Sequence, residues 1–198
     1  MTGRLLCFGF GYSARALARQ LDPEWHLTGT SRGEPDGPLP ADRHIRRLRF
    51  DRDHPLDPTA FAGIYGPGRS PFDALRAGMA RRIDKPGQVF SRIHVDDLAI
   101  VLRASISRPW PGAVYNVCDD APASPADVIA HAAGLLGLPA PPLVPFETAE
   151  LSPMARSFYA DNKRVSNALI KQELGVRLRY PSYRDGLPAI LAGENAGS

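Results

Sequence analysis

Three small residues stand near the start of the chain in the pattern Gly9-x-Gly11-x-x-Ala14. An apolar run from Leu5 to Phe8 precedes them, and a helical pattern of apolar residues follows. In such a turn the first glycine allows a tight bend, the second lets phosphate oxygens approach the backbone, and the small third residue lets the helix pack closely on the strand. The amides that begin the helix then face the anion, so the pattern predicts a site for a dinucleotide pyrophosphate.

The residues around this turn predict which dinucleotide binds. Tyr12 and Ser13 belong to the same loop, and Ser13 is expected to cap the helix. A second strand is predicted over 25–32, and it closes on Ser31 and Arg32. The end of this strand faces the adenosine ribose in a Rossmann unit, where a hydroxyl and a guanidinium suit a 2′-phosphate. We therefore expect NADP(H) in preference to NAD(H); the alternative is that Arg32 is a solvated loop residue.

A third, edge-like strand is predicted over 44–51, and Asp51 at its end is placed to contact the adenine. The acidic residues that follow it over 53–57 lack the glycine and the spaced ligands of a calcium loop. No pair of histidines has the spacing of a zinc site. A solvated turn is therefore predicted there, and no metal site.

The composition is that of an ordinary globular protein. The 198 residues are 43% hydrophobic and 23% charged, which allows one domain, or one domain with a small lobe. The net charge is only +3 and the basic residues are scattered, which argues against a nucleic-acid partner. No run approaches the roughly 20 apolar residues of a membrane span, so a cytoplasmic location is the default expectation. Cys7 and Cys118 are expected to be buried small hydrophobes.

The second half of the chain is predicted to be richer in helices. We expect a short helix within 70–80, a hairpin over 81–93, a helix after His94 that Asp96 or Asp97 caps and that packs on a sheet, and a buried strand over 113–120. Ser124 should cap the next helix and Gly137 should end it. A late helix should begin at Asp161 or Asn162 and bury Val165, Ala168 and Leu169, and the tail from Tyr183 should be weakly helical and frayed from Glu194.

Four blocks together resemble one protein family. They are GFGYSA at the start, IYGPGR at 64–69, FSRIHVDDLAIVL at 90–102 and VYNVCDD at 114–120. In this co-linear set the chain resembles the NAD(P)-dependent epimerase/dehydratase family, an extended or atypical branch of the short-chain dehydrogenases/reductases. The resemblance implies an α/β, Rossmann-like parallel sheet, and an oxidoreductase that acts on a sugar-like or other small carbonyl substrate.

The resemblance also places three residues on the substrate side. Tyr65 and Arg69 are candidates to meet a substrate, with Arg69 clamping a phosphate or carboxylate. The alternative is that Gly66-Pro67-Gly68 simply makes a turn. His94 stands at a position that recurs beside the substrate lobe, where a structural hydrogen bond is favoured over catalysis.

The middle of the family pattern has no counterpart in this sequence. The resemblance implies that further strands follow the third, together with a catalytic Ser or Thr and a Tyr-x-x-x-Lys pair, before the IYGPG block. The chain passes from Phe61 to Ile64 with no room for them. A Tyr-x-x-x-Lys does occur at Tyr159 and Lys163, but it precedes the late helix and is interpreted as a coincidence. We therefore predict a sheet without its central strands, and name no catalytic residue.

The predicted organisation has two parts in one compact unit. Residues 1–61 form the dinucleotide-binding half, and residues 62–198 form the remaining half with a small helix-rich substrate lobe. Loss of the neighbouring strand would leave the first strand with an unpaired apolar edge, which natural proteins avoid. Either the 114–118 strand moves in beside it, or a second chain covers it as a homodimer, or the protein is poorly stable.

Three functions stay open on the sequence. The first is an oxidoreductase that binds NADP(H) but is impaired or inactive. The second is a non-catalytic nucleotide-binding or interaction module. The third is an internally deleted copy without function.

Overall fold

The computed structural model describes residues 4–7, 12–21, 24–31, 45–49, 63–110, 113–151, 156, 159, 162 and 164–196. Every strand pair among these residues is parallel, as the α/β prediction requires. One sheet has the order β1-β2-β3, and two further pairs join β4 to β6 and β5 to β7. The strands are β1 Arg4–Cys7, β2 His26–Ser31, β3 Ile45–Arg49, β4 Gly63–Tyr65, β5 Arg82–Asp84, β6 Arg92–His94 and β7 Leu143–Pro145.

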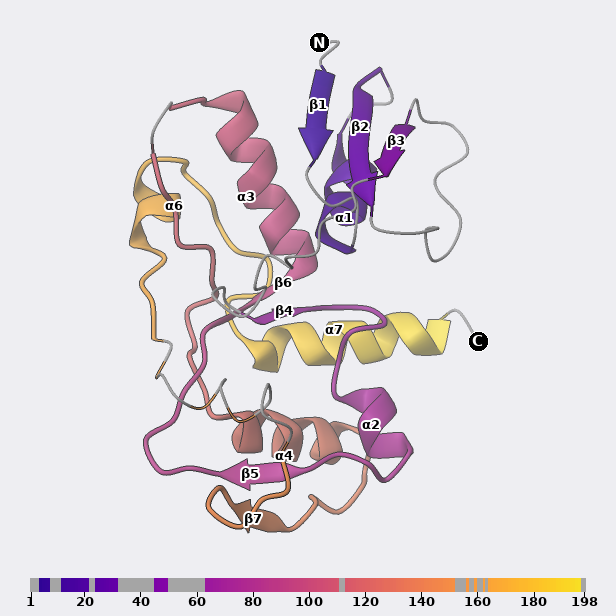
Figure 1. Cartoon of the computed structure of the whole chain (residues 1–198), viewed down its shortest axis with the longest axis vertical. Helices are drawn as coiled ribbons and strands as arrows, with labels where there is room; N and C mark the ends of the chain where they lie inside the picture. The colour runs from indigo at the N-terminus through magenta and orange to yellow at the C-terminus, as the bar shows by residue number, and fades with distance from the viewer. Residues whose placement is uncertain are drawn as a thin grey trace.

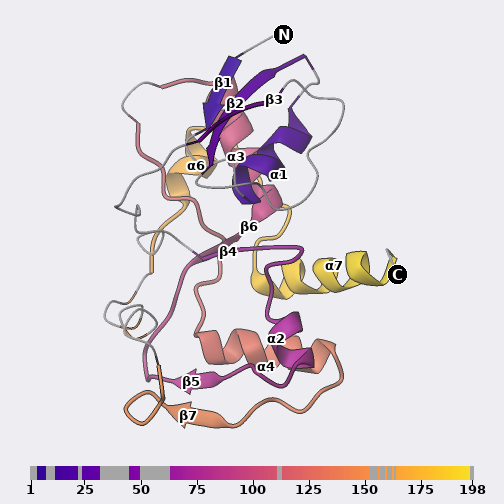
Figure 2. The same cartoon turned by 45° about the vertical axis from the view of Figure 1, so that its right-hand side comes forward.

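The helices surround these strands at two levels (Figure 1). They are α1 Tyr12–Gln20, α2 Phe72–Arg76, α3 Val95–Ser107, α4 Pro125–Leu135, α6 Ala168–Gln172 and α7 Tyr183–Ala196. The β1-β2-β3 sheet lies with α1 and α3 at one end of the molecule, and α2, α4, β5 and β7 lie at the other, with α7 between them (Figures 1 and 2). We call α2, β5, α4, β7 and α7 together the C-terminal lobe.

Helix α3 packs closely on α1, and Ile64 of the β4-β6 pair packs against the same cluster. Small side chains allow this close approach, because alanines occupy both sides of the contact. The buried members of this α1–α3 interface are Ala16, Leu17, Ala18, Leu21, Val95 and Ala99, with Leu102 and Ile106 packed against them. The amide of Gln20 also donates to the carbonyl oxygen of Asp96 at 3.2 Å. A largely apolar contact between α1 and α3 thus joins the N-terminal part of the chain to the part after residue 62.

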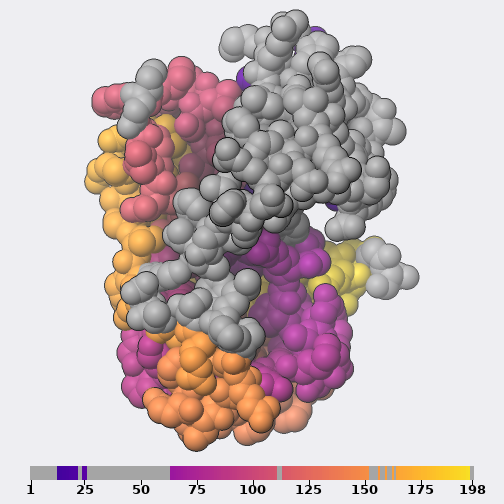
Figure 3. All heavy atoms as spheres, in the orientation of Figure 1, coloured from indigo at the N-terminus to yellow at the C-terminus, as the bar shows by residue number. Residues whose placement is uncertain are grey.

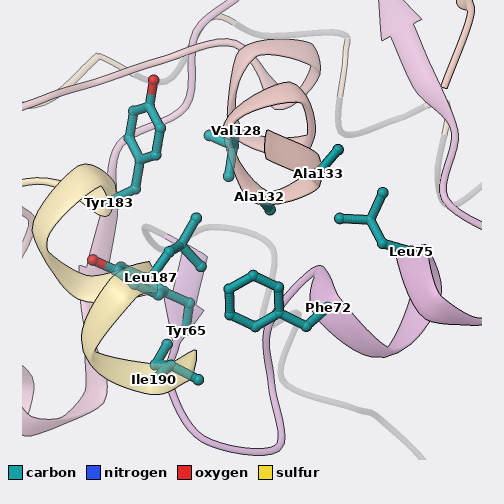
Figure 4. Close-up of a cluster of buried hydrophobic side chains, with 9 residues drawn as sticks. All are labelled: Tyr65, Phe72, Leu75, Val128, Ala132, Ala133, Tyr183, Leu187 and Ile190. Atoms are coloured by element: carbon teal, nitrogen blue, oxygen red, sulfur yellow. The ribbon is translucent and has the colours of Figure 1, made fainter. Parts of the chain in front are cut away.

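The C-terminal lobe has its own apolar core (Figure 4). Phe72 and Leu75 of α2 point toward one face of α4, and Leu187 and Ile190 of α7 close the cluster. Ser124 caps α4 as predicted, since its hydroxyl accepts from the amide of Asp127 at 3.0 Å. Gly137 ends α4 with a positive φ of 67°. The amide of Leu138 donates to the carbonyl of Ala133, the pattern of a Schellman motif.

Two predicted β elements of the second half are wrong. The 113–120 segment forms no strand: the amide of Asp119 donates to the carbonyl of Arg92 in β6 at 2.6 Å, but no ladder follows, and Val114 is 81% exposed. The predicted hairpin over 81–93 does not form either, because its arms pair with different partners, β5 with β7 and β6 with β4. A local turn at Lys85–Gln88 remains, closed by a 3.1 Å hydrogen bond, but tertiary pairing separates the strands beyond it.

The last two helices also differ from the prediction. Helix α6 begins at Ala168 rather than near Asn162, and it buries Ile170 while Val165 and Leu169 stay 39% and 44% exposed. Helix α7 runs for 14 residues through Gly186 and Pro188. Glu194, expected to be frayed, pairs with Arg76 of α2 at 2.7 Å. Packing on α2 and α4 thus stabilises a helix whose own propensities are weak.

Strand β1 pairs only with β2 among the strands that the structure describes. The edge that the sequence predicts to be open is therefore not closed by the 114–118 segment.

Figure 3 shows in space-filling form the face of the C-terminal lobe that β5, β7 and α2 contribute. The boundary proposed at residue 61 stays a prediction.

Candidate functional site

The backbone of the first sixty residues has the arrangement that a dinucleotide loop requires. Strand β1 ends at Cys7 and α1 begins at Tyr12, so four residues separate the strand from the helix. The register pairs Cys7 with Gly29 and Ser31 with Arg49, so the carboxyl ends of three parallel strands point the same way. A crevice at these ends is where open α/β sheets bind ligands.

The predicted cofactor residues are only partly covered by the structure. Tyr12 opens α1, and Ser13 and Ala14 lie half-buried in its first turn. Ser13 is therefore inside the helix and not at the cap position before it, which corrects the expected capping role. Ser31 closes β2 as expected. The remaining predicted cofactor residues, Gly9, Gly11, Arg32 and Asp51, lie outside the described residues.

His94 is placed at the start of α3 and caps it through its side chain. Its Nδ1 accepts from the amide of Asp96 at 3.2 Å. An accepting Nδ1 carries no proton, and burial lowers the pKa of this imidazole, so the neutral form is favoured. The expected structural hydrogen bond of His94 is confirmed. The expected cap by Asp96 or Asp97 is wrong, because His94 precedes them and takes the role.

Asp97 ties α3 to the segment that enters α7. Its carboxylate oxygens accept from the amides of Arg179 at 2.7 Å and Tyr180 at 2.9 Å, and the side chain is completely buried. Burial raises the pKa of this carboxyl, and the two amides oppose that rise. Asp97 therefore holds the segment before α7 in place. Because the carboxylate is buried, water cannot replace the two amides as hydrogen-bond partners.

Tyr65 lies within the core rather than on a surface. Its hydroxyl donates to the carbonyl of Ser182 at 3.3 Å, and its ring meets the ring of His94 edge-on at 5.2 Å. A methyl group on Gly186 would lie only 2.3 Å from the Tyr65 hydroxyl oxygen, so this glycine is needed for the close approach of α7. Burial, with nearby carboxylates, raises the pKa of the phenol strongly. The hydroxyl stays protonated and acts as a donor.

Arg92 and Asp119 are two buried charged residues that the sequence did not single out, and the backbone amide of Asp119 donates to the carbonyl of Arg92 at 2.6 Å. The Arg92 guanidinium donates to the carbonyl of Ala123 at 3.0 Å and lies 5.4 Å from the centre of the Tyr183 ring. Asp119 accepts from the amide of Ala121 at 3.1 Å. One oxygen, Oδ2 of Asp119, and one nitrogen, Nη1 of Arg92, find no partner in the structure. Burial raises the pKa of Asp119 to about 7, while Arg92 opposes the rise.

We call Tyr65, Arg92, His94, Asp97 and Asp119 the polar junction, since they lie where β4, β6, α3 and α7 meet. Only His94 and Tyr65 were candidates on the sequence. Asp97 had one usable signal: it stands four residues before Val101, on the buried side of α3. Asp119 lies within the stretch predicted to be a buried strand, but no sequence signal indicated that its carboxylate has a function.

The remaining substrate-side candidate, Arg69, lies in a tight turn. The amides and carbonyls of Gly66 and Arg69 exchange two hydrogen bonds, at 3.1 and 2.9 Å. The turn predicted for Gly66-Pro67-Gly68 is thus present, and it leaves the Arg69 side chain exposed. Contact of Arg69 or His94 with a substrate stays a prediction.

Tyr159 does not have the surroundings of a catalytic tyrosine. It packs against Phe90 and Phe146, with ring centres 5.7 and 5.2 Å away. Burial raises the pKa of its hydroxyl, whereas a tyrosine that exchanges a proton needs a lower pKa. The interpretation of Tyr159 and Lys163 as a coincidence agrees with this packing. Within the described ranges no group of three or more His, Cys, Asp or Glu could hold a metal ion, and no helix is long and apolar enough to cross a membrane.

Comparison with known proteins gives a match of substantial identity over almost the whole chain. A conserved protein of unknown function from Silicibacter pomeroyi is 40% identical, with a TM-score of 0.84, over 96% of this chain and 99% of that one. The human epimerase family protein SDR39U1, solved with NADPH, has a TM-score of 0.68 at 14% identity over 97% of this chain and 99% of that chain. A putative NAD-dependent epimerase/dehydratase from Methylobacillus flagellatus shares the fold, with a TM-score of 0.63 at 21% identity over 96% of this chain and 98% of that chain.

One curated relative matches part of the chain. A 3-diazoavenalumate denitrifying reductase from Streptomyces is 31% identical over 139 residues, which is 64% of this chain and 44% of the reductase. The chain thus spans less than half the length of that relative. No family model matches the sequence.

Proposed function

Because the chain belongs to one family with the Silicibacter pomeroyi protein and has the fold of NAD-dependent epimerases/dehydratases, we propose that it binds a nicotinamide dinucleotide at the carboxyl ends of β1–β3. The observation that supports this proposal is that only four residues separate β1 from α1, in a parallel sheet that continues with β2 and β3. NADP(H) is the preferred form, held through Gly9, Gly11, Tyr12, Ser13 and Ala14 on the pyrophosphate and through Ser31, Arg32 and Asp51 on the adenosine.

We propose further that the chain has weak or no oxidoreductase activity. The passage from Phe61 to Ile64 omits the segment that would carry the Ser/Thr and the Tyr-x-x-x-Lys pair. Tyr65 and Tyr159 cannot replace the missing tyrosine, because burial raises the pKa of both hydroxyls. If a substrate binds, it is a small carbonyl or sugar-like compound on the side of Arg69 and His94. A non-catalytic nucleotide-binding module is the alternative.

The binding proposal is tested by thermal unfolding with and without NADPH. A ligand that binds only the folded chain raises its stability by about 2.7 kcal/mol at a hundredfold excess over Kd. We expect NADPH to raise the Tm, NADH to raise it less, and Gly11→Val to abolish both shifts. Gly193→Val is the matched control, since no atom lies within 4 Å of a Cβ placed at Gly193. A Tm that does not respond to either dinucleotide contradicts the proposal.

The cofactor preference and the activity have separate tests. Arg32→Ala should reduce the affinity for NADPH by about tenfold and leave that for NADH unchanged, because only NADPH carries the 2′-phosphate. Equal loss of affinity for both dinucleotides would assign Arg32 another role.

Oxidation of NADPH with a panel of carbonyl compounds, followed at the absorbance of the reduced nicotinamide, should stay at background. Sustained turnover would show that the chain is an active oxidoreductase.

The open edge of β1 is proposed to be covered by a second copy of the chain. An unpaired edge of a parallel sheet offers a row of free amides and carbonyls, and association removes it. Light scattering on the purified protein should give twice the monomer mass at high concentration and a lower mass on dilution. A constant monomer mass with cooperative unfolding would exclude this assembly.

A further inference from the structure

Two buried groups of opposite charge lie next to each other in the polar junction without forming an ion pair. Arg92 of β6 is 8% exposed and Asp119 is 2% exposed, and the amide of Asp119 donates to the carbonyl of Arg92 at 2.6 Å. Nη1 of Arg92 and Oδ2 of Asp119 are both buried, and neither has a hydrogen-bond partner among the residues that the structure describes. An unpaired polar atom is costly in such surroundings, and contact between these two would remove the cost for both.

Each of the two side chains is held by its other polar atoms. Nη2 of Arg92 donates to the carbonyl of Ala123 at 3.0 Å, and the guanidinium lies 5.4 Å from the centre of the Tyr183 ring. Oδ1 of Asp119 accepts from the amide of Ala121 at 3.1 Å. Both anchors belong to the turn that leads from Asp119 to α4. Nη1 and Oδ2 therefore remain available to each other while the anchors stay in place.

Arg92 is the one cation among the side chains that act most strongly on Asp119. The others are carboxylates that already have partners: Asp97 of α3 accepts from two backbone amides, and Asp120 pairs with Lys171. If Asp119 ionises, it adds a further negative charge that Arg92 is placed to balance. The remaining titratable groups around the pair are Tyr65 of β4, Cys118, Asp127 of α4 and Tyr183 of α7.

The protonation state of Asp119 decides how strongly the two groups attract each other. Burial raises the pKa of Asp119 to about 7 from the usual 3.8, the charges of Asp120 and Asp97 act in the same direction, and Arg92 opposes the rise. Below this pKa the carboxyl is neutral, and its attraction to the guanidinium is weak. Above it, two opposite charges face each other where the dielectric is low, and their attraction is strong.

We propose that Arg92 and Asp119 form a pH-sensitive switch: loss of the Asp119 proton brings Oδ2 and Nη1 into contact, and the resulting ion pair ties β6 to the turn that leads into α4. Ala121, Ala123 and Tyr183, which contact the pair, line a hollow of about 580 Å³ in the C-terminal lobe. The switch therefore acts on the wall of this hollow. It rests on the polar junction alone and does not depend on the dinucleotide site.

Carboxyl and guanidinium NMR of the full chain, titrated from pH 4 to pH 9, tests the proposal. We expect the Asp119 signal, identified by its loss in Asp119→Asn, to titrate well above the usual 3.8, and the Arg92 Nη signals to change with the same midpoint. Arg92→Met should raise the midpoint by about one pH unit, because it removes the opposing charge, and Arg92→Lys should restore most of the difference. Asp73→Asn removes an exposed carboxylate of α2 and, as the matched control, should leave the midpoint unchanged.

Thermal unfolding tests the contact between the two side chains. At pH 5 the double variant Arg92→Met with Asp119→Asn should change the Tm by the sum of the two single changes. At pH 9 the double variant should lose less than that sum, because only the ionised wild type holds the pair. If Arg92→Met does not fold, the NMR titration of the wild type decides by itself. Titration of Asp119 near 3.8, Arg92 signals that do not follow it, or the same coupling at both pH values overturns the proposal.

Discussion

Helix α3 belongs to two regions of the molecule: the α1–α3 interface, which apolar packing stabilises, and the polar junction, which hydrogen bonds stabilise. In the α1–α3 interface it contributes Val95 and Ala99 to a contact made of small apolar side chains. At the polar junction its first turn contributes Asp97, completely buried and bonded to two backbone amides. The dry contact depends on area and shape and is insensitive to pH. The polar junction depends on a few directional bonds, so the loss of one partner leaves another buried group unsatisfied.

The largest expected effect is at Asp97, and it tests the polar side of this comparison. Asp97→Ala removes the acceptor of two buried amides, and we expect it to lower the free energy of unfolding by about 3 kcal/mol. Denaturant unfolding at pH 7 measures the change. Asp96→Ala is the matched control on the neighbouring residue, which is partly exposed, and it should cost under about 1 kcal/mol. Equal effects of the two substitutions would remove the distinction between the junction and an ordinary helix start.

The dry side of the comparison is tested at Leu17. Leu17→Ala removes a side chain that is 4% exposed and leaves a cavity between α1 and α3, at an expected cost of about 2.5 kcal/mol. The cost should be the same at pH 5 and pH 8, because no titratable side chain belongs to the buried cluster. Unfolding curves at both values check this, and a marked pH dependence would show that the interface is not dry.

Gly186 tests how closely α7 approaches the polar junction. Gly186→Ala places a methyl group against the Tyr65 ring and hydroxyl, and overpacking of this kind costs about 2 kcal/mol. The double variant Gly186→Ala with Tyr65→Leu should lose less stability than the sum of its single variants, since leucine removes the atoms that clash. Simple additivity of the two changes in Tm would contradict the close packing.

The smallest expected effect, and the one that depends on pH, is at Asp119. Its pKa in the folded chain is raised to about 7 from the usual 3.8, so its contribution to stability is present below pH 4 and is lost as the pH rises through 7. Asp119→Asn keeps an acceptor for the amide of Ala121 and removes this titration. We expect the variant to gain stability relative to the wild type as the pH rises from 5 to 8. Parallel stability curves for the two proteins would show that Asp119 is ionised throughout.

The local elements near capping and turn residues could be predicted from the sequence. Ser124 and Gly137 bound α4 as expected, because a cap or a left-handed glycine acts within a few residues. The strand-helix-strand-strand order of the first fifty residues follows equally from the apolar run, the glycine turn and the helical period. These signals act between residues close together in the sequence, so they do not depend on the tertiary contacts of the folded chain.

The failed predictions share a different physical origin. Residues 113–120 have the composition of a strand, yet the one backbone hydrogen bond seen between them and a described strand is that of the Asp119 amide to the Arg92 carbonyl of β6, which does not make a ladder. Helix α7 persists through Gly186 and Pro188 because Leu187 and Ile190 are buried against α2 and α4. Tertiary packing overrides local preference in both cases.

The sequence by itself determined the order of strand and helix at the start of the chain, the closing of β2 at Ser31 and the boundaries of α4, since these depend on neighbours along the chain. Only the tertiary structure decided that α3 packs on α1, that Asp97 bonds to the amides of Arg179 and Tyr180, and that the amide of Asp119 bonds to the carbonyl of Arg92. These contacts join residues 27 to more than 80 positions apart, and no local pattern specifies such pairs. The physical reason is that burial and hydrogen bonding act through space, and the chain selects among partners only when it is compact.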